Sequence, residues 1–331
     1  MIDNSNLEFV PPSPLNVAVL FLVFNRLEHT IEVFKSIQLA KPPRIYIAAD
    51  GAREGVNGEQ DKVDHIREFI TNNIDWDCEV YTLFRKNNLG CKLAVNNAIS
   101  WFFKHEEMGI ILEDDCLPSQ SFFWYCEELL NRYKNSKDIF CINGIGEFKL
   151  SKEFNSDYSF TKYIHLWGWA SWRRVWDRYD VNISDWMENK LNLLDIVSDN
   201  INTKKYWKRV LQGVYDSKID TWDYQFSYLI LKNHGKCIIP KVNLVSNIGF
   251  GTNATHTLDP DDKHANRITY NINFPIKHPD KKIFNSEIDK FFDNNFFTER
   301  SIITRIIGKI HRIIRKILRI LKKKLIFKGK L

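Results

Sequence analysis

Residues 109–115 read Gly-Ile-Ile-Leu-Glu-Asp-Asp, an apolar run followed by three consecutive acids. The apolar part predicts a buried strand, so the acids lie at its carboxyl end, where open α/β sheets bind ligands. Carboxylate oxygens on a short loop suit a hard divalent cation such as Mg²⁺ or Mn²⁺, and that cation can hold a diphosphate. A solvated acidic turn is the alternative. We predict the metal site, because a turn needs no apolar strand before it.

Hydrophobic periodicity alternates between strand and helix on both sides of this stretch. We expect strands over 17–24, 44–49, 79–84, 109–112 and 139–142, and helices over 28–39, 60–72, 91–104 and from about 120. Such alternation predicts a mostly parallel sheet with helices on both faces. The polar turns after the first two strands then share an edge with the acids, so three strand ends converge on one crevice.

Composition fits one large α/β domain with additions: 331 residues, of which 44% are hydrophobic and 14% aromatic. The six cysteines form no CxxC pair, and residues 1–14 are polar and proline-rich rather than a signal peptide. We therefore expect a cytoplasmic protein with reduced thiols. The early apolar run 17–24 is too short for a membrane span, which needs about 20 residues. Dinucleotide-binding, P-loop and zinc motifs are absent from the sequence.

The carboxyl-terminal segment differs from the rest in charge. Twelve of the 47 Lys and Arg residues and no acid lie from Arg300 onward, which leaves 35 bases against 41 acids before it. Isoleucines at three- and four-residue steps alternate with these bases, a pattern that predicts a basic amphipathic helix on an anionic membrane surface. A helix docked on the protein's own core and a nucleic-acid arm are the alternatives; a nucleic-acid helix needs no continuous isoleucine stripe.

Several short motifs in a fixed order carry a resemblance to a known family. They are Val23-Phe24-Asn25-Arg26, Ala48-Ala49-Asp50-Gly51, Ile111-Leu112-Glu113-Asp114-Asp115, Leu166-Trp167-Gly168-Trp169, Thr221-Trp222-Asp223 and Gly235-Lys236-Cys237-Ile238-Ile239-Pro240, leading to Phe250-Gly251 and His256. In order and spacing the chain resembles the GT-A nucleotide-sugar glycosyltransferases, particularly the N-acetylglucosaminyltransferase I type with its Glu-Asp-Asp motif. The resemblance covers about 15–257 and implies a Rossmann-like GT-A α/β fold.

The resemblance also implies roles for the acids and for two residues after the first strands. Asp115 would bind the metal, Mn²⁺ or Mg²⁺, while Glu113 and Asp114 would face the donor sugar and ribose. Arg26 would meet a phosphate and Asp50 the base, roles that a guanidinium and a carboxylate can fill. Arg26 as a surface charge at a helix start and Asp50 as a turn former are the alternatives.

Asp223 is the predicted general base, because it matches the acid that follows Trp in the family motif. An inverting transfer needs a carboxylate to take the proton of the attacking acceptor hydroxyl. Asp220 is an alternative base, and an acid that only stabilises a helix amino terminus is another interpretation. Tyr224 stands where the family pattern has a second acid. The fold supports both inverting and retaining transfer.

The aromatic stretch that contains Trp167, Gly168 and Trp169 predicts a wall on which a sugar ring stacks, with burial in the core as the alternative. Gly168 indicates a close approach to the backbone. Residues 249–256 resemble a lid over bound donor, and His256 could touch the diphosphate or the metal; a solvated loop histidine is the alternative.

We therefore expect a flexible leader over 1–14, a GT-A domain over 15–298 and the basic helix over 299–331. Within the domain, 15–150 would bind the nucleotide and 151–298 the acceptor. The predicted function is metal-dependent sugar transfer from a nucleotide sugar, UDP-linked, to a saccharide or lipid-linked saccharide at the inner face of a bacterial plasma membrane. A catalytically silent sugar- or nucleotide-binding module and a membrane adaptor are the alternatives.

Overall fold

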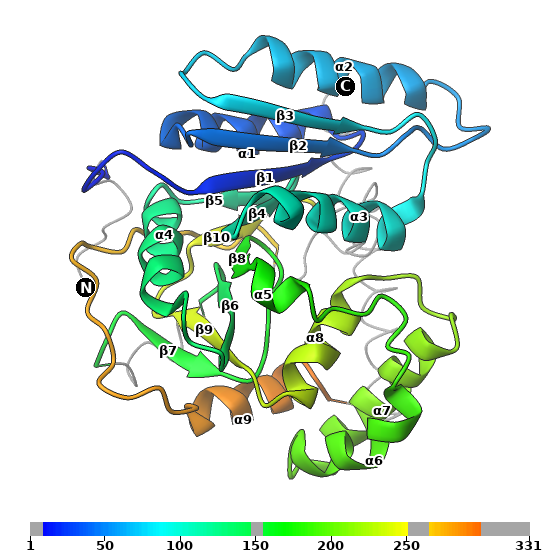
Figure 1. Cartoon of the computed structure of the whole chain (residues 1–331), viewed down its shortest axis with the longest axis vertical. Coiled ribbons are helices and arrows are strands. Elements are labelled where there is room, and N and C mark those ends of the chain that lie inside the picture. Colours follow the sequence, from blue (N-terminus) through cyan, green and yellow to red (C-terminus); the bar gives the residue numbers. More distant parts are fainter. Residues whose placement is uncertain (1–8, 147–154, 251–264, 299–331) are drawn as a thin grey trace, which may run out of the picture.

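A computed structural model describes residues 9–146, 155–250 and 265–298 of the chain. Its main feature is a mixed sheet of eight strands with helices on both faces (Figure 1). The strands of this sheet, in spatial order, are β3 (Glu79–Phe84), β2 (Arg44–Ala49), β1 (Ala18–Val23), β4 (Met108–Glu113), β8 (Trp169–Trp172), β6 (Ile139–Asn143), β9 (Lys236–Pro240) and β7 (Tyr158–Thr161). The predicted α/β class is confirmed.

Helices and a small second sheet complete the described parts. The helices are α1 (Leu27–Ala40), α2 (Glu59–Asn72), α3 (Gly90–His105), α4 (Ser121–Tyr133), α5 (Arg173–Trp176), α6 (Trp186–Ile196), α7 (Ile201–Tyr215), α8 (Asp223–Lys232) and α9 (Ser286–Asn295). The second sheet is an antiparallel pair of β5 (Cys116–Pro118) with β10 (Val245–Asn247). The elements predicted over 17–142 are confirmed, each within about two residues.

The order of the strands places the acids at a reversal of the chain. β1 pairs in parallel with both β2 and β4, with Leu20 aligned with Tyr46 on one side and with Ile111 on the other. β2 and β3 follow β1 on one side of it in the sheet, whereas β4 pairs with the other side of β1, so the direction of strand order reverses there. Ligands of open α/β sheets bind outside the carboxyl ends of strands at such a switch point.

Two apolar cores hold the fold. The larger one surrounds the central strands, which are fully buried because helices cover both faces of the sheet. The smaller one joins α6, α7, α8 and α9 around Trp186, Trp207 and Phe292, all of which are fully buried. In the part of the chain that the structure describes, no helix is long and apolar enough to cross a membrane.

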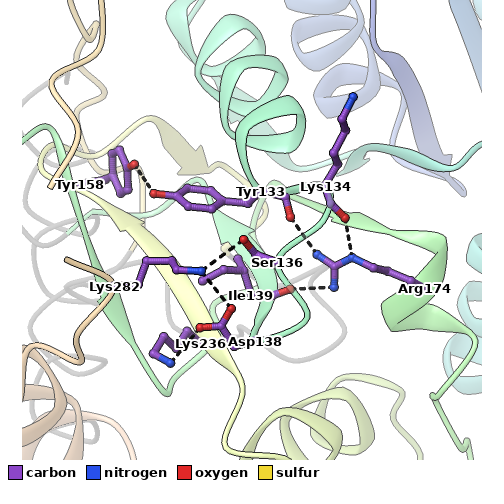
Figure 2. Close-up of polar contacts among 9 residues, drawn as sticks. All are labelled: Tyr133, Lys134, Ser136, Asp138, Ile139, Tyr158, Arg174, Lys236 and Lys282. Atoms are coloured by element: carbon purple, nitrogen blue, oxygen red, sulfur yellow. Dashed lines mark hydrogen bonds and ion pairs between the residues drawn. The ribbon is translucent and has the colours of Figure 1, made fainter. Parts of the chain in front are cut away.

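The amino ends of β6 and β9 are fixed by polar contacts around the turn after α4. Arg174 of α5 donates to the backbone carbonyl oxygens of Tyr133, Lys134 and Ile139, in and on either side of this turn, at 3.0–3.2 Å (Figure 2). Asp138 in the same turn pairs with Lys236 of β9 at 3.1 Å and with Lys282 at 3.3 Å. These contacts lie at the amino ends of the parallel strands, so they support the sheet at the end opposite to the acids.

Candidate active site

A cavity of about 600 Å³ lies at the carboxyl ends of β1 to β4. Polar side chains from the turns after these strands line its mouth, and small apolar residues of α3 line one wall. The predicted convergence of three strand ends is therefore confirmed by the position of this cavity. Its polar lining residues are Asn25, Arg26, Asp50, Arg53, Arg85, Asn88, Glu113, Asp114, Asp115 and Asn247.

The three acids after β4 concentrate negative charge at one side of the cavity. Glu113 ends β4, and Asp114 and Asp115 are buried directly after it. Burial raises the pKa of Glu113, and the neighbouring carboxylates of Asp115 and Asp114 raise it further. Burial also raises the pKa of Asp114, although Arg26 opposes that shift. Since burial and mutual repulsion both disfavour ionised carboxylates here, the site favours a bound cation.

Arg26 supplies part of that positive charge from within the chain. Its guanidinium Nη1 lies 2.9 Å from Asp115 Oδ2, and its Nη2 donates to Asp114 Oδ1. Burial alone would lower the pKa of Arg26, but the two carboxylates raise it above its usual value. Only 22% of the Arg26 side chain is exposed. The alternative of a surface charge at a helix start is therefore wrong: Arg26 precedes α1 but lies against the acids.

Asp50 connects the end of β2 to the start of α3. Its carboxylate accepts the backbone N–H groups of Leu89 at 3.0 Å and Gly90 at 3.1 Å, and also that of Gly51 at 3.0 Å. A carboxylate at a helix amino terminus satisfies free N–H groups and interacts favourably with the helix dipole. The turn-forming interpretation of Asp50 thus has direct support, and the same carboxylate also lines the cavity.

Two further arginines line the cavity and were not predicted. Arg53 pairs with the buried Glu59, whose carboxylate also accepts from Asn25 at 2.8 Å. The Arg85 side chain lines the cavity and has no ion pair with an acid in the described ranges. Arg85 is the first residue after β3. The predicted end of that strand could therefore have placed Arg85 at the same edge of the sheet as the acids.

The segment after β10 covers Asp115. Ile248 N donates to Asp115 O at 2.8 Å, and Gly249 N donates to Asn247 Oδ1 at 2.9 Å. A Cβ atom on Gly249 would lie 2.1 Å from Asp115 Oδ2, so any larger residue here would force Asp115 or the backbone to shift. Asn247 is buried and lines the cavity, and it was also not predicted.

Asp223 is the first residue of α8 and is half-buried. Its Oδ1 accepts from Thr221 Oγ1 and from Tyr224 N at 2.8 Å. Asp223 lies close enough to the acids to contribute to the raised pKa of Glu113, after burial and the nearer carboxylates. Asp220 is exposed, and its Oδ2 lies 3.8 Å from where a Cβ of Gly90 would be. Neither residue lines the cavity itself.

The aromatic stretch divides between the cavity and the core. Trp167 lines the cavity and meets the ring of Phe250 edge-on at 5.6 Å. Trp169 is 0% exposed and packs on Trp222 and Phe226, so its ring faces are covered by protein. The predicted stacking wall is therefore wrong for Trp169, which belongs to the core. Gly168 has φ +67° and is buried against Val245, which agrees with the expected close backbone approach.

The remaining predicted features lie outside the described residues. They are His256 with the part of the predicted lid 249–256 from residue 251 onward, the first part of the leader 1–14, and the basic helix over 299–331. They stay predictions from the sequence.

The acidic side of the cavity fits a divalent cation whose coordination is completed by a ligand. Among the residues that the structure describes, no three His, Cys, Asp or Glu side chains converge into a metal cage. Mg²⁺ and Mn²⁺ need only one or two carboxylates when substrate phosphates and water supply the other oxygens. Within the described ranges the buried Asp114 Oδ2 has no hydrogen-bond partner, and a bound cation or a ligand donor would satisfy it.

The fold and this cavity define a doubly wound α/β protein with a carboxylate site at its switch point. No family model and no curated protein matches the chain. Among solved structures, it is similar to the mannosyltransferase PcManGT of Pyrobaculum calidifontis in complex with GDP-Man and Mn²⁺ at 12% identity and a TM-score of 0.37, covering 68% of this chain and 72% of that one.

Two other similar structures are S. aureus TarS 1-349 and a UDP-glucose pyrophosphorylase complexed with UDP-glucose. The first has 10% identity and a TM-score of 0.37, covering 66% of this chain and 72% of that one. The second has 8% identity and a TM-score of 0.33, covering 68% and 90%. At these TM-scores and identities, the similarity assigns no family to the chain.

Proposed function

We propose that this protein transfers a sugar from a nucleoside diphosphate sugar to a saccharide or lipid-linked saccharide acceptor. The observation that carries the proposal is the set of acids at the end of β4, where the buried Asp114 Oδ2 has no hydrogen-bond partner among the described residues. These acids share one cavity with Arg26 and Arg85. Carboxylates beside guanidinium groups match a cation bound together with a diphosphate.

The chain's residues divide the work of donor binding. Asp115 would hold Mn²⁺ or Mg²⁺, with Asp114 beside it. Such a cation stabilises the charge that develops on a departing diphosphate. Arg26 and Arg85 would donate to phosphate oxygens, Asp50 would contact the base near the start of α3, and Glu113 would face the sugar or ribose. Trp167 would pack on the donor sugar.

Asp223 would act as the general base in an inverting transfer. Its Oδ1 is held by Thr221 and Tyr224, so the orientation of the carboxylate is fixed, and its other oxygen is left to accept a proton. The acceptor hydroxyl would lose its proton to that oxygen as it attacks C1 from the face opposite the diphosphate. Asp220 is more exposed, and no hydrogen bond from a described residue holds its carboxylate.

We also propose that the donor is UDP-linked, as the sequence resemblance implies, and that the acceptor is anchored in a membrane. The second point rests on the basic amphipathic pattern of 299–331, which would bind the cytoplasmic face of an anionic membrane. Removing 299–331 should lower both binding to anionic vesicles and turnover on lipid-borne acceptor; unchanged values for both would contradict the membrane role.

The donor site can be tested by calorimetric titration of UDP and GDP into the full chain with and without Mn²⁺. We expect nucleotide binding that needs Mn²⁺, is lost in Asp115→Ala and is retained in Asp223→Asn. Release of sugar from candidate UDP-sugars, followed by chromatography, should be lost in both variants. Nucleotide binding unaffected by Asp115→Ala would contradict the assigned cation ligand.

A further inference from the structure

We infer that Arg26 is an internal counter-ion that competes with the divalent cation for Asp114 and Asp115, so that cation and diphosphate bind cooperatively. This inference rests on the proposed function. It concerns how binding at the donor site is controlled. Without a diphosphate, Arg26 already neutralises the carboxylates that a cation would bind. A bound diphosphate pairs with Arg26 and so frees the carboxylates.

The contacts of Arg26 are those of a bridging ion. One guanidinium nitrogen, Nη1, lies 2.9 Å from Asp115 Oδ2, and the other, Nη2, donates to Asp114 Oδ1. The backbone of Arg26 is fixed, because its carbonyl oxygen accepts from Thr30 N at 3.0 Å and from Thr30 Oγ1 at 2.8 Å. Release of the carboxylates therefore requires only a movement of the side chain.

Competition follows from the charges. A cation that takes Asp115 Oδ2 replaces the Arg26 contact, and a cation on either oxygen lies next to a positive guanidinium, whose repulsion is weakly screened in a largely buried site. A diphosphate that binds without the cation faces the carboxylates. When both bind, the cation neutralises the carboxylates and the diphosphate oxygens accept hydrogen bonds from the guanidinium. Each ligand thereby cancels the electrostatic repulsion that opposes binding of the other.

The other arginines of the cavity provide a comparison. Arg53 is already paired with Glu59. Arg85 lines the cavity but forms no ion pair with the acids in the described ranges. Removal of Arg85 should therefore weaken diphosphate binding without freeing Asp115 for a cation, whereas removal of Arg26 should do both.

The test is calorimetric titration of Mn²⁺ into the full chain, with and without saturating UDP, for wild type, Arg26→Gln, Arg26→Lys and Arg85→Gln. In wild type we expect UDP to raise the affinity for Mn²⁺ within the range of about 5- to 150-fold usual for coupled sites. Because coupling is reciprocal, Mn²⁺ should raise the affinity for UDP by the same factor.

In Arg26→Gln we expect Mn²⁺ alone to bind about tenfold more tightly than in wild type, with the enhancement by UDP largely lost. Arg26→Lys should be intermediate, because an ammonium keeps the charge but cannot bridge two carboxylates as the guanidinium fork does. Arg85→Gln should keep the wild-type affinity for Mn²⁺ alone. Thermal unfolding of each variant checks that it is folded.

The outcomes separate this inference from the proposed function. If wild type binds Mn²⁺ and UDP cooperatively but Arg26→Gln does not bind Mn²⁺ alone more tightly, the counter-ion role is wrong and the proposed function stands. Equal gains in Arg26→Gln and Arg85→Gln would also overturn it, because they would reflect general charge removal. Absence of Mn²⁺ and UDP binding in every folded variant would overturn both.

Discussion

Gly249→Ala should damage the cation site although residue 249 carries no functional group. The added Cβ would lie 2.1 Å from Asp115 Oδ2, and Cβ contacts are essentially never shorter than 3.0 Å, so the carboxylate or the backbone must move by about 0.9 Å. The backbone is held by hydrogen bonds from Ile248 N to Asp115 O and from Gly249 N to Asn247 Oδ1. The added Cβ would also lie 2.7 Å from Asp115 Cβ, so we expect the carboxylate to move together with a smaller shift of the backbone.

A displacement of that size is large for a metal ligand, whose distances vary within about 0.2 Å. We expect the affinity for Mn²⁺ in the presence of UDP to fall about 10- to 100-fold, as for loss of a group that orients a metal ligand. Overpacking should cost about 1–3 kcal/mol of unfolding free energy.

The assay is Mn²⁺ titration in saturating UDP beside urea unfolding, with Gly235→Ala as the matched control. A Cβ on Gly235 would lie 2.6 Å from a ring carbon of Phe140, so this substitution also overpacks the protein but crowds an apolar ring instead of an acid. Gly235→Ala should lose stability and keep its affinity. Wild-type affinity in Gly249→Ala, or an equal loss of affinity in both variants, would refute the reasoning.

Three further predictions concern stability and turnover. The pKa of Glu59 is lowered to about 2, chiefly by hydrogen bonds from the Arg53 side chain, so its stabilisation is full above about pH 4.5 and is lost as pH falls through about 2. Since Arg53 is half-exposed, we expect Glu59→Gln to cost about 1–2 kcal/mol at pH 7 and progressively less as pH falls from about 4.5 through 2 in urea unfolding; a difference independent of pH would contradict this. Asp223→Asn should keep Mn²⁺-dependent UDP binding and lose sugar transfer in a product assay, and loss of binding would show that the base is misassigned. Trp169→Ala should cost about 3–5 kcal/mol because its fully buried ring leaves a cavity, whereas Trp167→Ala should cost less and weaken donor binding; similar unfolding midpoints for the two variants would contradict the division.

Local sequence patterns predicted the first half of the fold well. The strands at 44–49 and 79–84 have the predicted bounds, because each is a short run of strand-forming residues between polar turns, although only the first is buried and the second is the half-exposed edge strand. The position of Glu113 to Asp115 followed from the same reasoning, since parallel strands bring their carboxyl ends to one edge.

Contacts between distant parts of the chain could not be predicted in this way. Asn247 reaches the acids because β10 pairs with β5, with Asn247 aligned with Cys116, and no local pattern specifies that pairing. Whether the rings of Trp167 and Trp169 are buried depends on which side of this segment is covered by residues distant in the sequence. Likewise, the charge of Arg26 was evident from the sequence, but its position across Asp114 and Asp115 required the register of β1 and β4.

The most direct test of the central claim is whether Asp115 makes nucleotide binding depend on a cation. Thermal unfolding of the full chain with UDP should shift to higher temperature only when Mn²⁺ is present, because ligand binding to the native state stabilises it by RT ln(1 + [L]/Kd). The account predicts this shift in wild type and its absence in Asp115→Ala. An unchanged midpoint in wild type with every nucleoside diphosphate, with and without Mn²⁺, would contradict it.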